Sequence, residues 1–141
     1  MGTRSDIIVH RKDGKYARVY CHWDGYLSHN GQILFEHYGT QAKAEKLVEP
    51  GDISSLAPSC NKPKGHTYDN AVKGYTVYYG RDRGEEGTEA RVGNTLKDVS
   101  GDWNEYTYLF DKGQWWLIGY EPPTPEDHLY PLAQALQQEH T

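Results

Sequence analysis

The clearest alternation of apolar and polar residues lies near the N-terminus and predicts a β-hairpin. Residues 6–11 form a β-branched run, residues 16–23 alternate, and Asp-Gly lies between the two runs. Asp-Gly between extended runs is the strongest short signal for a hairpin. A period of two places one set of side chains on the core face, and that set is Ala17, Val19, Cys21 and Trp23. The opposite face then carries Tyr16, Arg18, Tyr20 and His22.

Two helices are predicted after this hairpin. The first runs from a cap among residues 28–30 to about Tyr38, because Ser and Asn are favoured at helix N-caps. The second begins after a Thr40 cap, carries its apolar residues on one stripe, and stops before Pro50-Gly51.

The middle of the chain has little periodicity. We expect a single turn at residues 52–56 and a long connection over residues 57–73, which are rich in Pro, Gly, Asn, Lys and Ser. A loop of this length inside a compact domain is usually functional or mobile. Residues 74–79 are predicted to form a third strand, and the charged, glycine-containing residues 81–87 a turn.

The last third of the chain predicts a second hairpin and a helix. Residues 104–110 and 114–120 are the expected strands, and the second of them is apolar on both faces, which is typical of a central strand. Arg91-Val92 and residues 96–99 are short candidates for a strand and a helical turn. The C-terminal helix is expected from Thr124 onward, and Pro131 indicates a kink or a later start.

These elements indicate an α+β fold with a mainly antiparallel sheet of about five strands, two hairpins plus one strand, and about three helices. The chain has 141 residues and shows no repeat or linker, so residues 1–141 are expected to form a single domain. Hydrophobic residues make up 36% of the chain, and its 12 Tyr and 4 Trp residues must supply much of the core.

Charge and cysteine content exclude several classes of protein. A net charge of −5 argues against binding of bulk nucleic acid, which usually requires a basic face. Two cysteines form neither a disulfide framework nor a zinc motif, so we predict no metal and no cofactor. The N-terminus lacks the apolar region of a signal peptide, and no apolar run approaches 18 residues. We therefore expect a cytoplasmic protein without membrane contact.

The first candidate site is His22 with Asp24. In an extended strand, side chains two positions apart point to the same side. The imidazole and the carboxylate can then serve as acid and base, or contact a ligand, and with His29 and His37 nearby they can also ligate a metal. The alternative is that His22 and Asp24 make only local hydrogen bonds in the turn.

Arginines supply the second and third candidates. Arg81 and Arg83 lie in a glycine-flanked segment and can clamp a phosphate or carboxylate. The alternative is a solvated turn in which Asp82 and nearby acids neutralise both arginines. Arg4 precedes the first strand and can lie beside its neighbours, unless the terminus is frayed.

Aromatic residues supply the fourth candidate. If the tyrosines and Trp23 share one open face with these arginines, they form a site for stacking and phosphate binding. If they are spread over both faces, they form the core or a surface for a protein partner. No catalytic residue is assigned, and the candidate ligand-binding residues are Arg4, Tyr20, His22, Trp23, Asp24, Tyr26, Tyr79, Arg81 and Arg83.

Four segments carry a resemblance to a known group of proteins. They are Thr3-Arg4-Ser5, Tyr20-Cys21-His22-Trp23-Asp24-Gly25-Tyr26, Gly51-Asp52-Ile53-Ser54-Ser55-Leu56 and Tyr79-Gly80-Arg81-Asp82-Arg83-Gly84, with Gly31, Leu34 and His37-Tyr38 between the second and the third. Together they resemble small proteins encoded by bacteriophages and prophages, over roughly residues 1–120. The resemblance implies a phage accessory gene whose product acts in the bacterial host cytoplasm. Small phage proteins of this kind often counter host defence.

These observations predict a phage-encoded accessory binding protein. It is expected to counteract a bacterial defence system by binding a host defence protein or by sequestering a nucleotide-like signal. The alternative is a phosphodiesterase-type enzyme that acts on a nucleotide with His22 and Asp24. The absence of a complete catalytic motif favours a role without catalysis. A small Tyr-rich domain can also form a homodimer.

Overall fold

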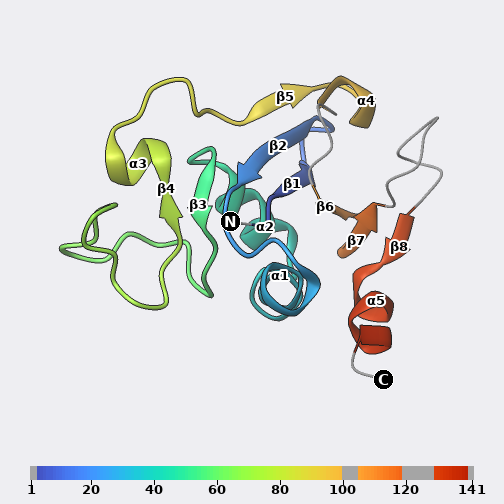
Figure 1. The fold of residues 1–141 in the computed structure, drawn as a ribbon. Coiled ribbons are helices and arrows are strands. Elements are labelled where there is room, and N and C mark those ends of the chain that lie inside the picture. Colours follow the sequence, from blue (N-terminus) through green and yellow to red (C-terminus); the bar gives the residue numbers. More distant parts are fainter. Residues whose placement is uncertain (1–2, 100–104, 119–128, 140–141) are drawn as a thin grey trace.

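The computed structural model describes residues 3–99, 105–118 and 129–139 and has an α+β fold (Figure 1). Its centre is a mixed eight-stranded sheet in the order β4-β3-β2-β1-β6-β7-β8, with β5 paired to β2 off this path. The strands are β1 (Ser5–His10), β2 (Tyr16–Cys21), β3 (Ile53–Ser55), β4 (Val77–Tyr78), β5 (Arg91–Gly93), β6 (Tyr106–Asp111), β7 (Gln114–Ile118) and β8 (Leu129–Pro131).

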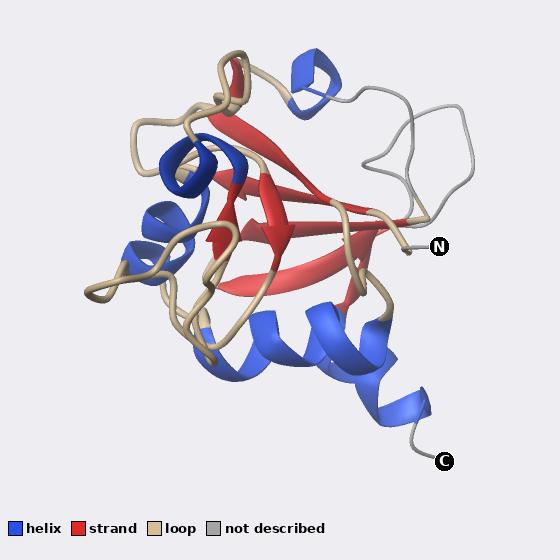
Figure 2. Cartoon of the chain, turned by 60° about the vertical axis from the view of Figure 1, so that its left-hand side comes forward, coloured by secondary structure: helices blue, strands red, loops and turns tan. Residues whose placement is uncertain are grey.

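Helices cover one face of this sheet more fully than the other. They are the π-helical turn η1 (Leu27–Gly31), α1 (Gln32–His37), α2 (Gln41–Val48), α3 (Tyr79–Arg83), α4 (Leu96–Val99) and α5 (Leu132–Glu139). In Figure 2 the helix leading to the C-terminus lies with others along the lower side of the strands. The main core lies between the sheet and η1, α1, α2 and α5. A smaller core on the opposite face includes Leu96 and Val99 of α4. Within the described ranges, no helix is long and apolar enough to cross a membrane.

The predicted N-terminal hairpin is confirmed, except for the last two residues of its second strand, His22 and Trp23. β1 and β2 pair antiparallel, and Ala17, Val19 and Cys21 are buried as the alternation indicates. Trp23, however, is 42% exposed, so its assignment to the core is wrong. β2 ends at Cys21, and Asp24 adopts a left-handed conformation with φ 56°. The chain therefore leaves the sheet before the alternation can place Trp23 inside.

The second predicted hairpin is also confirmed. β7 pairs with β6 on one side and with β8 on the other, so it is an internal strand. Trp115 packs in the main core, whereas Trp116 packs against the smaller core on the other face. The sheet is mixed rather than simply antiparallel because β1 pairs parallel with β6 and β2 pairs parallel with β3.

The prediction of about five strands is wrong because short strands carry no readable period. β3, β5 and β8 have three residues each, and β3 replaces the single turn expected at residues 52–56. Three residues are too few to show alternation, and distant partners decide their conformation. α5 begins at Leu132, after β8, and the helix start expected at Thr124 lies outside the described residues.

Two local predictions about the helices can also be compared with the structure. The Thr40 hydroxyl accepts a hydrogen bond from the Lys43 N–H at 3.3 Å, which confirms the cap of α2. The first helical segment starts earlier than predicted, at Leu27, and begins with a π-helical turn. A turn was predicted over residues 81–87, but residues 81–83 belong to α3, and this difference changes the candidate site.

Candidate functional site

The N-terminal segment is fixed against the loop that follows β2. The Gly25 N–H donates to the Thr3 carbonyl oxygen at 2.7 Å, and the Asn30 side chain donates to the Ser5 hydroxyl at 3.3 Å. A Cβ at Gly25 would lie 2.7 Å from the Ser5 Cβ, so only glycine allows this approach. Residues 3–5 are therefore held in place, and Arg4 lies exposed beside the end of β2.

Asp52 connects β2 to the start of α3. The outer edge of β2 pairs with β5 up to Arg18 and with β3 at Cys21. Between them, the Tyr20 N–H donates to Asp52 Oδ1 at 2.9 Å, and the Asp52 carbonyl oxygen accepts from the Tyr79 N–H at 3.2 Å. Burial raises the pKa of Asp52, although the Tyr20 hydrogen bond opposes this rise. Asp52 thus brings Tyr20 and Tyr79 to the same part of the surface.

A row of aromatic side chains runs from the end of β2 to α3. The Trp23 and His22 rings lie 4.6 Å apart edge-to-face, and His22 and Tyr20 lie 5.9 Å apart. Tyr20 Oη and His22 Nδ1 are hydrogen-bonded at 2.6 Å. Tyr79 interacts electrostatically with Tyr20, and its ring lies 5.8 Å from that of Tyr68. We call these residues, together with Arg4 and Arg83, the aromatic strip. Its members are Arg4, Tyr20, His22, Trp23, Tyr68, Tyr79 and Arg83.

Two guanidinium groups lie along the aromatic strip, that of Arg83 at its Tyr68 end and that of Arg4 near Tyr20 in its middle. The Arg83 side chain is exposed, and its guanidinium carbon lies 4.6 Å from the centre of the Tyr68 ring. Burial raises the pKa of Tyr20, and the positive charge of Arg4 opposes this rise. A cation above or beside a tyrosine ring is stabilised and remains available to an anionic group. The strip can therefore contact both planar apolar groups and anions.

Arg81 does not join Arg83 in a clamp. Its Nε donates to Asp82 Oδ1 at 2.9 Å, its Nη1 donates to the Cys60 carbonyl oxygen at 2.7 Å, and its guanidinium lies over the Tyr78 ring. Two residues apart on an α-helix are separated by roughly 200° around its axis. Because residues 79–83 form α3, the two arginines point to opposite surroundings, and Arg81 has a structural role.

A buried polar cluster lies behind Arg81. The Asp82 side chain is fully buried and accepts hydrogen bonds from the Tyr78 N–H at 2.8 Å and from Arg81. Val72 N–H donates to His66 Nδ1, which leaves the proton of the neutral ring on Nε2, 3.3 Å from Asp82 Oδ2. Burial by itself would raise the pKa of Asp82, but the hydrogen bonds from Arg81 and Tyr78 lower it below its usual value.

The predicted pair of His22 and Asp24 has no shared contact in the described structure. His22 contacts Tyr20 and Trp23, whereas Asp24 lies close to Tyr26 and its negative charge raises the pKa of the Tyr26 hydroxyl. The left-handed conformation of Asp24 turns the chain between the two side chains. Tyr26 is exposed, and its ring lies 6.1 Å from that of His29, in a neighbouring group.

Sequence reasoning missed Tyr68 and His66. Both belong to the connection between β3 and β4, in which no period or motif distinguishes them. In the described part of the chain, no group of three or more His, Cys, Asp or Glu side chains is arranged to hold a metal ion. Comparisons with protein families, curated proteins and solved structures found no match.

Proposed function

We propose that this protein is a phage-encoded accessory binding protein that counteracts a bacterial defence system. It binds a host protein through the aromatic strip. The single observation that carries this proposal is the composition of the strip. It combines Trp, Tyr and Arg, the residue types that dominate the energy of protein–protein interfaces. Trp23 is large and 42% exposed, which is expected of an anchor residue that becomes buried in a pocket of a binding partner. The phage context rests on the sequence resemblance.

The contacts of His22 favour binding over catalysis. A phosphodiesterase would need His22 and Asp24 within reach of the same phosphate and leaving group. His22 Nδ1 is instead engaged by the Tyr20 hydroxyl, and the Asp24 charge acts on Tyr26. The His22–Tyr20 hydrogen bond fixes the ring beside Trp23, which suits a rigid contact surface because little side-chain entropy is then lost on binding.

A nucleotide-like signal is the second candidate ligand. The observation in its favour is that two guanidinium groups accompany tyrosines of the strip: that of Arg83 lies over the Tyr68 ring, and the charge of Arg4 acts on the Tyr20 hydroxyl. A base that stacks on such a ring gains about 1–3 kcal/mol, and the guanidinium can hold its phosphate. We prefer a protein partner because the rings follow one another in a row that offers more contact area than one base covers.

Co-purification from bacteria that carry the defence system tests this proposal. The strip variant is Trp23→Ala with Arg83→Ala. The matched control is Phe35→Ala with Lys43→Ala, which removes an exposed aromatic ring and an exposed cation elsewhere on the surface. We expect one host protein to co-purify with the wild type and the control but not with the strip variant, and phage growth to follow the same order.

Native mass spectrometry of the same samples separates the two candidate ligands. A small molecule that leaves only on denaturation, and that the strip variant lacks, would support the nucleotide-like ligand instead. Equal recovery of the host protein by the wild type and the strip variant would refute the proposed surface. The same spectra measure whether the chain forms the homodimer that its composition suggests.

A further inference from the structure

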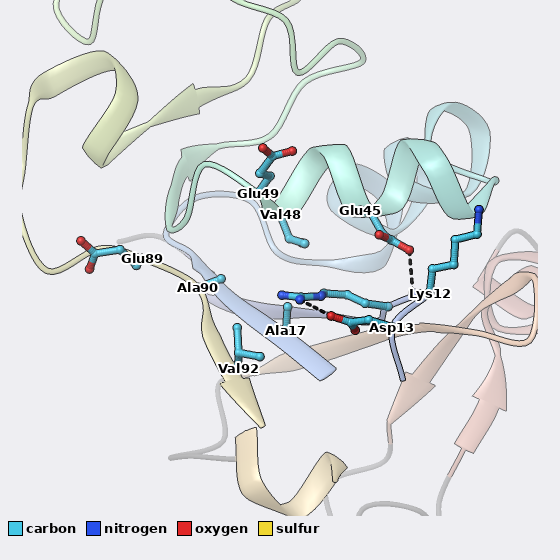
Figure 3. A pocket seen from close by; sticks show the side chains of 10 residues that line it. Lys12, Asp13, Ala17, Glu45, Val48, Glu49, Glu89, Ala90 and Val92 are labelled. Atoms are coloured by element: carbon cyan, nitrogen blue, oxygen red, sulfur yellow. Dashed lines mark hydrogen bonds and ion pairs between the residues drawn. The ribbon is translucent and has the colours of Figure 1, made fainter. Parts of the chain in front are cut away.

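The charged groups around the groove between α2 and the segment that enters β5 contact one another. The groove has a volume of about 740 Å³. Arg11, which lines it, forms an ion pair with Asp13, and the Lys12 N–H donates to the Glu45 carboxylate at 2.8 Å (Figure 3). These groups are satisfied without a ligand, in contrast to the exposed cations beside α3.

Positive charge is concentrated in the connection between β3 and β4 and in α3. Residues 57–84 contain two Asp, no Glu and five Lys or Arg residues, which are Lys62, Lys64, Lys73, Arg81 and Arg83. This segment therefore has a net charge of +3, whereas the whole chain has −5. In Figure 1 the connection and α3 lie together on one side of the molecule. An acidic protein thus carries a basic region at one place on its surface.

Three cationic side chains meet along residues 60–62. Arg81 Nη1 donates to the Cys60 carbonyl oxygen at 2.7 Å. Lys46 Nζ, from α2, donates to Asn61 Oδ1 at 2.6 Å. Lys62 Nζ donates to the Arg81 carbonyl oxygen at 3.4 Å. The Lys46 and Lys62 ammonium groups therefore lie beside the same short stretch of chain, next to α3.

Arg83 extends this group of cations to the aromatic strip. Its guanidinium lies over the Tyr68 ring, and the Tyr68 N–H donates to the Asp82 carbonyl oxygen at 3.0 Å. The exposed turn after Lys62 adds a further lysine. We call the exposed cations beside α3 the basic patch, and its members are Lys46, Lys62, Lys64 and Arg83.

The neighbouring carboxylates leave the basic patch with an excess of positive charge. Lys62 Nζ lies 3.9 Å from Asp82 Oδ1, but the Asp82 side chain is fully buried and is already paired with Arg81. Asp69 is exposed in the same connection. Glu85 follows α3 and interacts electrostatically with Tyr79. Four exposed cations therefore face solvent with little compensation from the chain itself.

We propose that the basic patch binds an acidic segment of the partner protein, next to the part of the partner that contacts the aromatic strip. Because the same host protein supplies both contacts, this assignment of its chemistry rests on the proposed function. Lysine ammonium groups are separate point charges on flexible stems, and they suit carboxylates that are distributed along a peptide. A single phosphate is held best by converging donors. Complementary charge of this kind speeds association and selects the partner.

A titration followed by NMR tests the patch directly. The probe is the capped peptide Gly-Glu-Glu-Leu-Glu-Glu-Gly, and its control is Gly-Gln-Gln-Leu-Gln-Gln-Gly, each added to the isotope-labelled full chain. We expect saturable shifts of the backbone amide signals of Asn61, Lys62, Lys64 and Tyr68 with the acidic peptide, at a millimolar or lower dissociation constant. The glutamine peptide should bind more weakly because it has no charge.

A short nucleic acid of equal charge is the second probe. A five-nucleotide oligothymidine without terminal phosphates carries as many negative charges as the acidic peptide. We expect it to bind the patch more weakly than the peptide does, because the lysines are spread along the connection and offer a phosphate no converging set of donors.

Two double variants with the same change in charge make the titration specific. Lys62→Gln with Lys64→Gln neutralises the centre of the patch, whereas Lys97→Gln with Lys112→Gln removes two exposed lysines from α4 and from the turn between β6 and β7. We expect the patch variant to weaken binding of the acidic peptide about two- to tenfold, the range of two exposed ion pairs. The control variant and Trp23→Ala should bind this peptide like the wild type.

Co-purification of the host protein separates this inference from the proposed function. We expect both the patch variant and Trp23→Ala to recover less host protein than the wild type. Full recovery by the patch variant together with loss in Trp23→Ala would overturn the acidic segment and leave the role of the strip intact. Full recovery by Trp23→Ala together with loss in the patch variant would refute the strip and support the patch.

Four results of the titration would also overturn the proposal. They are the absence of saturable shifts, equal affinity for the acidic and glutamine peptides, an equal loss of affinity in both double variants, and tighter binding of the oligothymidine than of the acidic peptide. The third result would indicate attraction to charge in general, and the fourth would indicate a nucleic acid partner. Unchanged unfolding curves of all variants show that any loss of affinity is local.

Discussion

Replacement of Asp82 by Asn is the sharpest test of the buried polar cluster behind α3. Asn has nearly the same size but no charge, and it offers one acceptor oxygen in place of two. Asp82 is fully buried and accepts hydrogen bonds from Arg81 Nε at 2.9 Å, Arg81 Nη2 at 3.1 Å and the Tyr78 N–H at 2.8 Å. The variant leaves the Arg81 guanidinium without its counter-charge.

The contacts of Asp82 set the expected loss of stability. Removal of one member of a buried ion pair costs about 3–5 kcal/mol, because the other charge remains uncompensated. Arg81 retains a side-chain exposure of 21%, so water can partly solvate it in the variant. The loss should therefore lie at the lower end of this range, and we expect the free energy of unfolding to fall by about 3 kcal/mol.

Urea denaturation at neutral pH, followed by far-UV circular dichroism, measures this loss. The matched control is Asp69→Asn, which neutralises an exposed carboxylate in the same connection between β3 and β4 and should change stability by less than about 0.5 kcal/mol. A loss below about 1 kcal/mol in the Asp82 variant would refute the assigned role.

The pH dependence of the free energy of unfolding provides a second test of the role of Asp82. The pKa of Asp82 is lower in the folded protein than its ordinary value of 3.8. Its stabilising contribution is therefore fully present above that value and is lost as the pH falls through the lower pKa of the folded state. The difference in stability between wild type and variant should shrink on acidification, and a constant difference would contradict the argument.

Three further predictions concern residues outside the buried polar cluster. Tyr108→Phe should lower the free energy of unfolding by about 1–3 kcal/mol, because the buried hydroxyl donates to the Gly25 carbonyl oxygen at 2.6 Å; an unchanged denaturation midpoint would contradict this role. Trp23→Ala should change stability by less than about 1 kcal/mol while it abolishes partner capture, since the indole is exposed; a loss typical of a core tryptophan would place it inside. Burial raises the pKa of the Cys21 thiol to about 12, so a thiol reagent should modify only the partly exposed Cys60 in the native protein, and rapid labelling of both would show that Cys21 is accessible.

The predicted ligand-binding residues can be compared with those that the structure brings together. Six of the predicted ligand-binding residues do lie in one row. They are Arg4, Tyr20, His22, Trp23, Tyr79 and Arg83. Their residue types could be read from local segments, but contacts between distant residues bring those segments together: Gly25 with Thr3, and Asp52 with Tyr20 and Tyr79. Asp24 and Tyr26 belong to a neighbouring group, and Arg81 points inward. Tyr68 completes the row but lies in a loop whose position no sequence period indicates.

By itself, the sequence determined the elements whose signals lie within a few residues of one another. Alternation and an Asp-Gly turn specified the first hairpin, and a threonine cap with an apolar stripe specified α2, because neighbouring residues alone create these patterns. It also determined the residue types of the surface, tyrosine with arginine on an acidic chain.

Only the tertiary structure decided the rest. β3, β5 and β8 exist because distant strands pair with them, since three residues lack a period of their own. The inward position of Arg81 depends on the Cys60 carbonyl group, 21 residues away, and on the buried His66 beside Asp82. The fold therefore decides which partners Arg81 contacts. The long connection that supplies Cys60 and His66 is placed by packing rather than by its own sequence pattern.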